Sequence, residues 1–460
     1  MTKKIFSLIL ALSVVLCTFA AISPVMAANN ETYVSKWNGS LFFTDADGTT
    51  STSWYESIKD DKVIKVYTAN QLAHLAYRSK GNSYSGQTIK LMTDIDLEGH
   101  QWVPICDVPG GGFSGTFDGN GHTIKNLYGK NLVSPSDYKP ERKTFGLIGV
   151  LNGTIKDLII DGVVYDLDSA CKDPIVGAIC GTGGHWSGSD TATPKIQNCA
   201  VKNVTFNVTS SPTFSSSRLD GVAAVCGIVY RNTTITDTYA KNVRFNFASA
   251  VANFQHGGFA NHLRSTAASF INCYLADAKE SVENAEPTDL RFGYVQNSGK
   301  VSMNLCYTTS NTTESTNIST SATSAANNLR VNAALKDLNY GLVTTSNKTG
   351  SYIADTADKN GGFPLLAIEV PVRDLKITKD GDKFKASAEF TYPDREPKLF
   401  LAAYDKTTNM LVFAKAADEN ENTIISEEFL DYDAEKHIIK AFVWRLGDCT
   451  PFVESVTYTE

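Results

Sequence analysis

The chain has 460 residues, of which 42% are hydrophobic and 20% are charged, so it carries enough apolar side chains for a core and for more than one domain. Its formal net charge is -7 and the sequence contains no basic cluster, which excludes nucleic acid and anionic membrane surfaces as expected partners. The same composition excludes a chain that is disordered throughout.

The first predicted segment is a secretory signal peptide over residues 1–27. Two lysines precede an apolar run from Ile5 to Ala21, and Ala27 is the small residue that a signal peptidase needs. A membrane anchor is the alternative, but Pro24 closes the run and no stop-transfer charges follow it. No later run reaches the roughly 20 apolar residues of a membrane-spanning helix. We therefore expect a protein that is secreted or associated with the cell surface.

Eight cysteines remain once Cys17 leaves with the signal peptide. An even count in an exported protein ordinarily indicates disulfides. However, Cys180 and Cys226 each precede a glycine in an apolar run, and Cys199 and Cys273 each follow an asparagine. Equivalent positions of successive repeats would stack as small buried residues, which favours buried thiols, with bridges between stacked neighbours as the alternative. The eight are Cys106, Cys171, Cys180, Cys199, Cys226, Cys273, Cys306 and Cys449.

Residues 28–66 hold aromatic residues among Ser, Thr and Asp, and we expect a strand or two there, beside the main body. Thr68 then provides a helix cap, and the apolar residues that follow it lie at i, i+3 and i+4. This pattern predicts a short helix that ends at Gly81. A helix at this position would shield the first exposed edge of a sheet.

Residues 113–127 read F-S-G-T-F-D-G-N-G-H-T-I-K-N-L, and the rest of the chain is organised around this stretch. Alternating residues flank four turn-forming residues, which predicts a strand, a tight corner and a second strand. A hairpin is one interpretation. Similar units recur downstream, which favours a chain wound repeatedly over itself.

The repeated unit can be aligned by its corner residue. Asp157, Asn198, Asp237 and Asn272 are separated by 198 − 157 = 41, 237 − 198 = 39 and 272 − 237 = 35 residues. Each follows a glycine-containing apolar strand, and a fifth unit is indicated at residues 292–305. Each strand would pair with its equivalent about 4.8 Å away in the next repeat, and Asn or Asp would form a column at the corners.

Four motifs carry a resemblance to a known family: D-I-D-L, W-V-P-I, the stretch at 113–127, and F-G-L-I-G followed by G-T-I-K-D-L. Together they resemble the GLUG-repeat β-helix region of exported and surface proteins of Gram-positive bacteria, over residues 67 to 366. The segments L-K-D-L-N-Y and N-G-G-F-P-L-L resemble the elements that close such regions. The resemblance implies a right-handed parallel β-helix and a role in adhesion or glycan binding.

The pattern changes after residue 372, where short strands alternate with turns and predict a small antiparallel β-sandwich. K-A-F-V-W at 440–444 resembles the immunoglobulin-like modules of exported bacterial proteins. The predicted fold is all-β. Its predicted parts are a signal peptide (1–27), a lead-in (28–66), parallel β-helix repeats (67–307), a Ser/Thr/Asn-rich excursion with a C-terminal cap (308–371) and an immunoglobulin-like β-sandwich (372–460).

A set of aromatic and basic side chains forms the candidate binding site. An aromatic ring on a Gly-rich loop can stack on a sugar face, and later repeats carry such residues at roughly equivalent positions. Partly packed side chains are the alternative interpretation. The candidates are His185, Trp186, Tyr230, Arg231, His256 and His262.

The acidic residues are the candidates for catalytic groups. Asp94 and Asp96 share a strand face, and Asp118 and His122 flank the Gly-rich corner, but turn and motif positions account for both pairs. No nucleophile, metal or cofactor motif occurs. We therefore expect a non-enzymatic binding protein whose partner is a glycan or a surface protein. A polysaccharide lyase or glycoside hydrolase is the alternative, and it requires carboxylates within about 10 Å of one another in a groove. A structural spacer, which requires no groove, is the third hypothesis.

Overall fold

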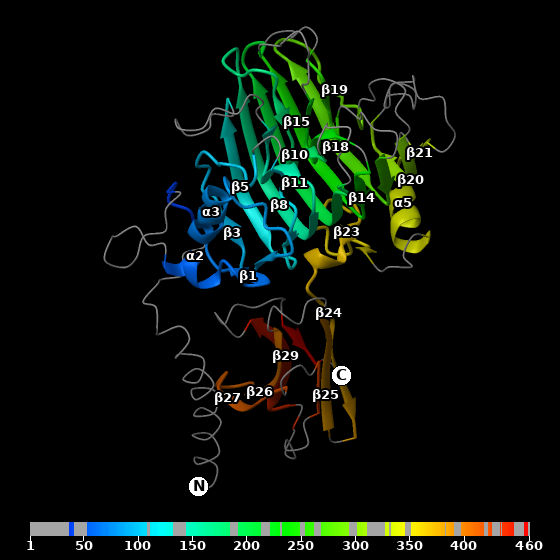
Figure 1. Ribbon diagram of the computed structural model, residues 1–460. Coiled ribbons are helices and arrows are strands. Elements are labelled where there is room, and N and C mark those ends of the chain that lie inside the picture. The colour runs from blue at the N-terminus through cyan, green and yellow to red at the C-terminus, as the bar shows by residue number, and fades with distance from the viewer. Residues whose placement is uncertain are drawn as a thin grey trace. The chain divides into compact units, whose positions relative to one another are not determined.

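In the computed structural model, the described residues are 36–40, 53–107, 111–131, 144–184, 192–212, 221–230, 232–248, 254–261, 268–293, 301–310, 327–330, 333–345, 351–381, 383–390, 397–417, 422–425, 433, 435–445 and 455–458. The predicted signal peptide, Cys449 and residues 311–326 of the predicted excursion lie outside them. Contacts between residues separate the chain into two compact units, with the boundary between Glu369 and Val370. Nearly all of the secondary structure is β, which confirms the all-β prediction (Figure 1).

The predicted helix is present as α3 (Ala69–Arg78). The Thr68 hydroxyl accepts from the Gln71 amide, and the Gln71 side chain accepts from the Thr68 amide, so a capping box starts the helix. The helix ends at Arg78, three residues before the predicted Gly81, and Ser79 is its C-cap: the Ser79 hydroxyl donates to the Ala76 carbonyl over 2.6 Å and so satisfies a carbonyl of the last turn. Its apolar face packs into the main core. Helix α2 (Ser53–Ile58) and strand β1 (Val63–Val66) precede it.

The largest sheet consists of strands from successive repeats that pair in parallel (Figure 1). Strands β4 and β5 both pair with β8, so D-G-N-G is a corner between consecutive strands, and the hairpin interpretation is wrong. The short β19 is antiparallel to β18. Besides β1, the strands are β2 (Thr88–Leu91), β3 (Ile95–Asp96), β4 (Thr116–Asp118), β5 (Thr123–Lys130), β8 (Thr154–Leu167), β11 (Lys195–Val208), β14 (Thr234–Thr236), β15 (Tyr239–Phe247), β17 (Ala268–Ile271), β18 (Tyr274–Val282), β19 (Thr288–Asp289), β20 (Val301–Thr308) and β21 (Asn327–Arg330).

The corner residues align in a column, as the sequence predicts. Asp157, Asn198, Asp237 and Asn272 are consecutive in the strand registers, and all four have φ between 47° and 54°. Asn198 Nδ2 donates to Asp157 Oδ1 over 2.7 Å, and Asn272 Nδ2 donates to Asp237 Oδ1 over 3.0 Å. Asn and Asp adopt this left-handed backbone more readily than other residues with a Cβ, and their side chains here also bond the neighbouring repeat.

Two smaller parallel sheets complete the repeats. One contains β6 (Thr144–Phe145), β9 (Ile175–Val176), β12 (Gly221–Ala223) and β16 (His256–Gly257), and the other contains β7 (Ile148–Leu151), β10 (Cys180–Gly183) and β13 (Cys226–Val229). Side chains of all three sheets share one core. The motif glycines allow the strands to approach closely: a Cβ on Gly177 would lie 2.4 Å from the Cys180 carbonyl oxygen and 2.7 Å from Cys226 Cα.

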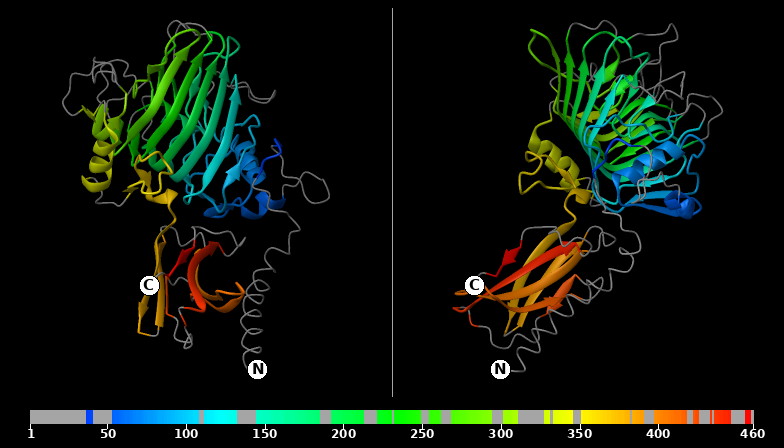
Figure 2. Two further views of the ribbon diagram at one scale, coloured as in Figure 1. Left: turned by 180° about the vertical axis from the view of Figure 1, so that it is seen from behind. Right: turned by 90° about the vertical axis from the view of Figure 1, so that its left-hand side faces the viewer.

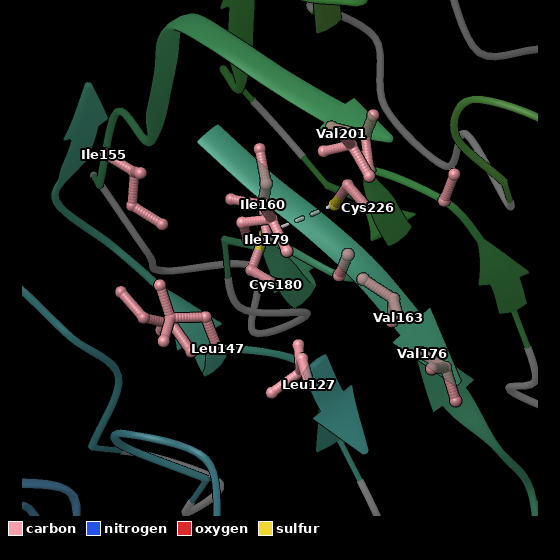
Figure 3. Packing of buried hydrophobic residues seen from close by; sticks show 14 of the residues in the cluster. Leu127, Leu147, Ile155, Ile160, Val163, Val176, Ile179, Cys180, Val201 and Cys226 are labelled. Atoms are coloured by element: carbon pink, nitrogen blue, oxygen red, sulfur yellow. Dashed lines mark hydrogen bonds between the residues drawn. The ribbon is translucent and has the colours of Figure 1, made fainter. Parts of the chain in front are cut away.

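The seven cysteines among the described residues are buried free thiols, in agreement with the favoured interpretation. Cys180 and Cys226 are register partners on β10 and β13, and their sulfur atoms lie 3.6 Å apart (Figure 3). Burial raises the pKa of the Cys180 thiol well above its ordinary value and raises that of Cys199 to about 12. Both cysteines therefore act as small apolar core residues at neutral pH.

Residues 352–369, which we call the strap, cover a row of buried tyrosines. Tyr239 and Tyr274 are register partners, and their rings stack with centroids 4.6 Å apart. The Tyr274 hydroxyl donates to the Pro364 carbonyl over 2.6 Å. Glu369 accepts from the Tyr239 hydroxyl and forms a 3.0 Å ion pair with Lys202. The elements of this region are α5 (Leu335–Leu338), the π-helix η1 (Asn339–Thr345), β22 (Tyr352–Ile353), β23 (Leu365–Leu366) and the 3-10 helix η2 (Ala367–Glu369).

The second unit contains two antiparallel sheets that share a core. One sheet has the order β24-β25-β28, and the other has the order β27-β26-β29-β30. Figure 2 shows the strands of this unit in orange and red. Leu399, Leu401, Ile439 and Val443 point into the core at alternate positions, as a strand period of two requires. The strands are β24 (Val372–Asp380), β25 (Lys383–Phe390), β26 (Pro397–Asp405), β27 (Leu411–Ala416), β28 (Thr423–Ile425), β29 (His437–Arg445) and β30 (Val456–Thr457).

Candidate functional site

Two of the six predicted binding residues are described by the structure, and they lie in different clusters. Tyr230 is 8% exposed and packs with Ile175 and Ile228. His256 lies on β16 among phenylalanine rings. The other four, His185, Trp186, Arg231 and His262, lie outside the described residues.

His256 forms a short ion pair with Glu280 on β18. Its Nε2 lies 2.6 Å from Glu280 Oε2, and its Nδ1 lies 3.1 Å from the Phe254 carbonyl oxygen, so both ring nitrogens face an oxygen. The hydrogen bond from His256 holds the pKa of Glu280 below its ordinary value, against the opposing effect of burial. Phe247 lies 5.3 Å from the imidazole, and this ring also lines the groove described next.

A groove of about 550 Å³ lies where the long parallel strands end. Charged and amide side chains form part of its wall, and Val208, Phe247 and Ala248 supply the apolar part. Phe247 is 7% exposed, so the core holds this ring in place at the edge of the groove. The lining residues are Lys130, Asp166, Asn207, Val208, Thr209, Asn246, Phe247, Ala248 and Glu283.

The polar wall is one row across adjacent strands. Lys130, Asp166, Asn207 and Asn246 are consecutive register partners on β5, β8, β11 and β15. Asn207 Nδ2 donates to Asp166 Oδ1 over 2.9 Å, and Asn246 Nδ2 donates to Asn207 Oδ1 over 3.0 Å. The Tyr128 hydroxyl donates to the other Asp166 oxygen over 2.9 Å. This network fixes the side chains of Asp166 and Asn207, while Asn246 at the end of the row stays exposed.

The groove combines an apolar wall with fixed amide and carboxylate groups. Such a surface can exchange hydrogen bonds with hydroxyl groups and also contact C–H groups, which suits a polyhydroxylated ligand. Both oxygens of Asp166 already accept hydrogen bonds, so this carboxylate holds the row together and is poorly placed to transfer a proton.

Asp94 and Asp118, which the sequence assigns to motif and turn positions, accept hydrogen bonds from nearby groups. Asp94 Oδ1 lies 2.9 Å from His122 Nδ1 and accepts from the Thr123 amide. Asp118 Oδ1 accepts from the Asn120 amide within the corner, and Asp118 Oδ2 accepts from Lys156 over 2.8 Å. These carboxylates tie the corner to neighbouring strands. Among the described residues, no group of three His, Cys, Asp or Glu side chains is placed to hold a metal ion.

Sequence reasoning missed the groove residues, although a signal for them exists. Asp166, Asn207 and Asn246 are separated by 207 − 166 = 41 and 246 − 207 = 39 residues, which are the same intervals that align the corner residues. Extending that alignment by nine positions would have placed these side chains in one row. Phe247 and Glu283 carry the same signal, since 247 − 208 = 39 and 283 − 248 = 35 repeat the intervals of the corner residues.

The described residues include no helix with both the length and the apolar character to cross a bilayer. Comparisons with family models, with curated proteins and with solved structures found no match to this chain.

Proposed function

We propose that this chain is an exported protein that binds glycans and has no catalytic role. In this proposal residues 1–27 are its signal peptide, and the stacked strands form a right-handed parallel β-helix of the GLUG-repeat type. The second unit is an immunoglobulin-like sandwich. The stacking of like residues in the corner column supports the repeat assignment.

The groove is the observation that carries the binding function. A spacer needs no concave surface, whereas this chain builds one from residues of four parallel strands, β5, β8, β11 and β15, and from the residues that directly follow β11, β15 and β18. Its amide groups offer both donors and acceptors, and its apolar wall includes an aromatic ring. Cell-surface and matrix polysaccharides have this chemistry, and contact with them would give adhesion.

Catalysis is the second candidate, because Asp166 and Glu283 are two carboxylates that line one groove. Both Asp166 oxygens already accept hydrogen bonds, and this favours a binding role over a catalytic one. Release of reducing or unsaturated sugar ends should be assayed on every glycan that binds. Turnover that Glu283→Gln abolishes would establish the enzyme and overturn the binding assignment.

The binding test is a glycan array followed by calorimetry on the full mature chain. Asn246→Ala removes the exposed amide from the groove and should weaken binding at least tenfold. Asn242→Gly is the matched control, since Asn242 bonds Asn203 over 2.6 Å in an equivalent ladder on the same strand and does not line the groove. Glycine avoids a backbone penalty there, because φ of Asn242 is 55°.

Binding that survives Asn246→Ala, or that falls equally in both variants, would exclude the groove as the site. If the protein bound no glycan on the array, the proposed glycan-binding function would be overturned. Unfolding curves of both variants identify any loss of affinity that is due to misfolding.

A further inference from the structure

The outer face of the four-stranded sheet in the second unit carries an aromatic platform. Leu399 and Leu401 of β26 and Ala441 and Val443 of β29 point into the core, so the alternate residues of both strands point outward. Three outward rings, those of Phe400, Phe442 and Trp444, are in mutual contact. Their centroids lie 4.9 to 5.5 Å apart.

The platform is accessible on this unit. Trp444 is 38% exposed, and Leu411 on the neighbouring β27 is 41% exposed. A core would bury such side chains, whereas Trp444 and Leu411 are two of the exposed large hydrophobic residues of the described chain. An exposed apolar patch of this kind marks an interaction surface.

The described charges on the outward face of β26 and β29 are of one sign. Lys398 is the register partner of Trp444, and Lys440 lies beside Phe442 on β29, with its Nζ 5.8 Å from the Tyr404 ring centroid. The remaining outward positions on β26 and β29 are Ala402, Tyr404 and Ile438, so the described outward residues of these two strands include no carboxylate. Two lysines therefore flank the rings on a protein whose net charge is -7.

We propose that this face binds an anionic polysaccharide, with sugar rings stacked on Trp444 and its aromatic neighbours and with carboxylate or sulfate groups paired with Lys398 and Lys440. Aromatic rings contact the apolar face of a sugar, and the lysines select for negative charge. The three rings already contact one another, so little of their side-chain entropy is lost on binding. This inference is independent of the groove in the first unit.

The probe is polygalacturonic acid, a linear polyanion, and its fully methyl-esterified form is the uncharged counterpart. The full mature chain should bind the acid and lose at least tenfold in affinity for the ester. Trp444→Ala should weaken binding of the acid at least tenfold, and so should the double variant Lys398→Glu/Lys440→Glu. Binding should also weaken as salt rises, because charge pairing contributes to it.

Lys385→Glu is the matched control, because Lys385 is exposed on the other sheet of the same unit. This control should bind like the wild type, and so should Asn246→Ala, which separates this face from the groove. Thermal unfolding of each variant checks that the unit is folded.

Three results would overturn the proposal. They are no binding of the acid by the wild type, equal binding of acid and ester, and a loss in Lys385→Glu as large as that in the double variant. The last experiment measures binding of the full mature chain to vesicles of anionic phosphatidylglycerol. Binding to these vesicles without binding to the polymer would assign the face to a membrane surface and exclude the polysaccharide.

Discussion

The two units use β-structure in opposite ways. In the first unit, parallel strands of successive repeats stack residues of the same type, such as Asn on Asp and Tyr on Tyr. In the second unit, antiparallel strands alternate core and surface residues, and neighbours in the sheet are neighbours in sequence more often. A substitution in the first unit should therefore disturb the repeats on both sides, whereas one in the second unit should stay local.

The largest expected effect is at Glu369. Its side chain is 5% exposed and bonds Lys202, Tyr239 and the Leu366 amide, so Glu369→Ala leaves a partly buried lysine without its partner. We expect a loss of about 3–5 kcal/mol in the free energy of unfolding. Glu389→Ala in the second unit removes a carboxylate that is 60% exposed, and its effect should stay within about 0.5 kcal/mol. Urea denaturation of both variants checks the difference, and similar losses would contradict it.

A smaller contrast is expected for two glycines. In Gly177→Ala the added methyl group meets backbone atoms of two neighbouring strands, which should cost roughly 3 kcal/mol because backbone cannot move aside cheaply. Gly381→Ala meets nothing within 4 Å and should cost about 1 kcal/mol for its φ of 59°. Calorimetry gives the loss of unfolding free energy in each variant. Equal losses in Gly177→Ala and Gly381→Ala would refute close packing of the repeats.

Two asparagines with the same backbone test the corner column. Asn198 has φ 54° and Asn409 has φ 55°, but only Asn198 bonds an equivalent residue in an adjacent repeat. Asn409→Ala should cost about 1 kcal/mol from the backbone alone, and Asn198→Ala about 2 kcal/mol because a hydrogen bond is lost as well. Asn198→Gly and Asn409→Gly carry no backbone penalty, so they isolate the contribution of the hydrogen bond. Asn198→Gly should still lose more stability than Asn409→Gly. Denaturation midpoints that coincide in the glycine pair would show that the column adds nothing.

The smallest effect concerns pH. The pKa of Glu280 in the folded chain lies below its ordinary value of 4.5, so its ion pair with His256 stabilises the fold above that pH. This contribution should fall as the pH drops from 4.5 through the depressed pKa, because the carboxylate becomes protonated. Melting temperatures measured from pH 6 to pH 3 should decline more steeply in the wild type than in Glu280→Gln. Parallel curves would exclude this contribution.

The sequence by itself determined the local structure of this protein. The Thr68 cap, the Asn and Asp corners and the glycine-containing strands follow from residue chemistry within a few positions, and the intervals of 41, 39 and 35 residues align the repeats. Only the tertiary structure decided where the helix ends, which rows form a groove and what covers the tyrosines. Glu369 meets Lys202 across 167 residues, and the aligned rows form a groove only because of how the strand ends and Glu283 pack. No local pattern encodes such contacts, since they depend on packing between segments that are remote in the chain.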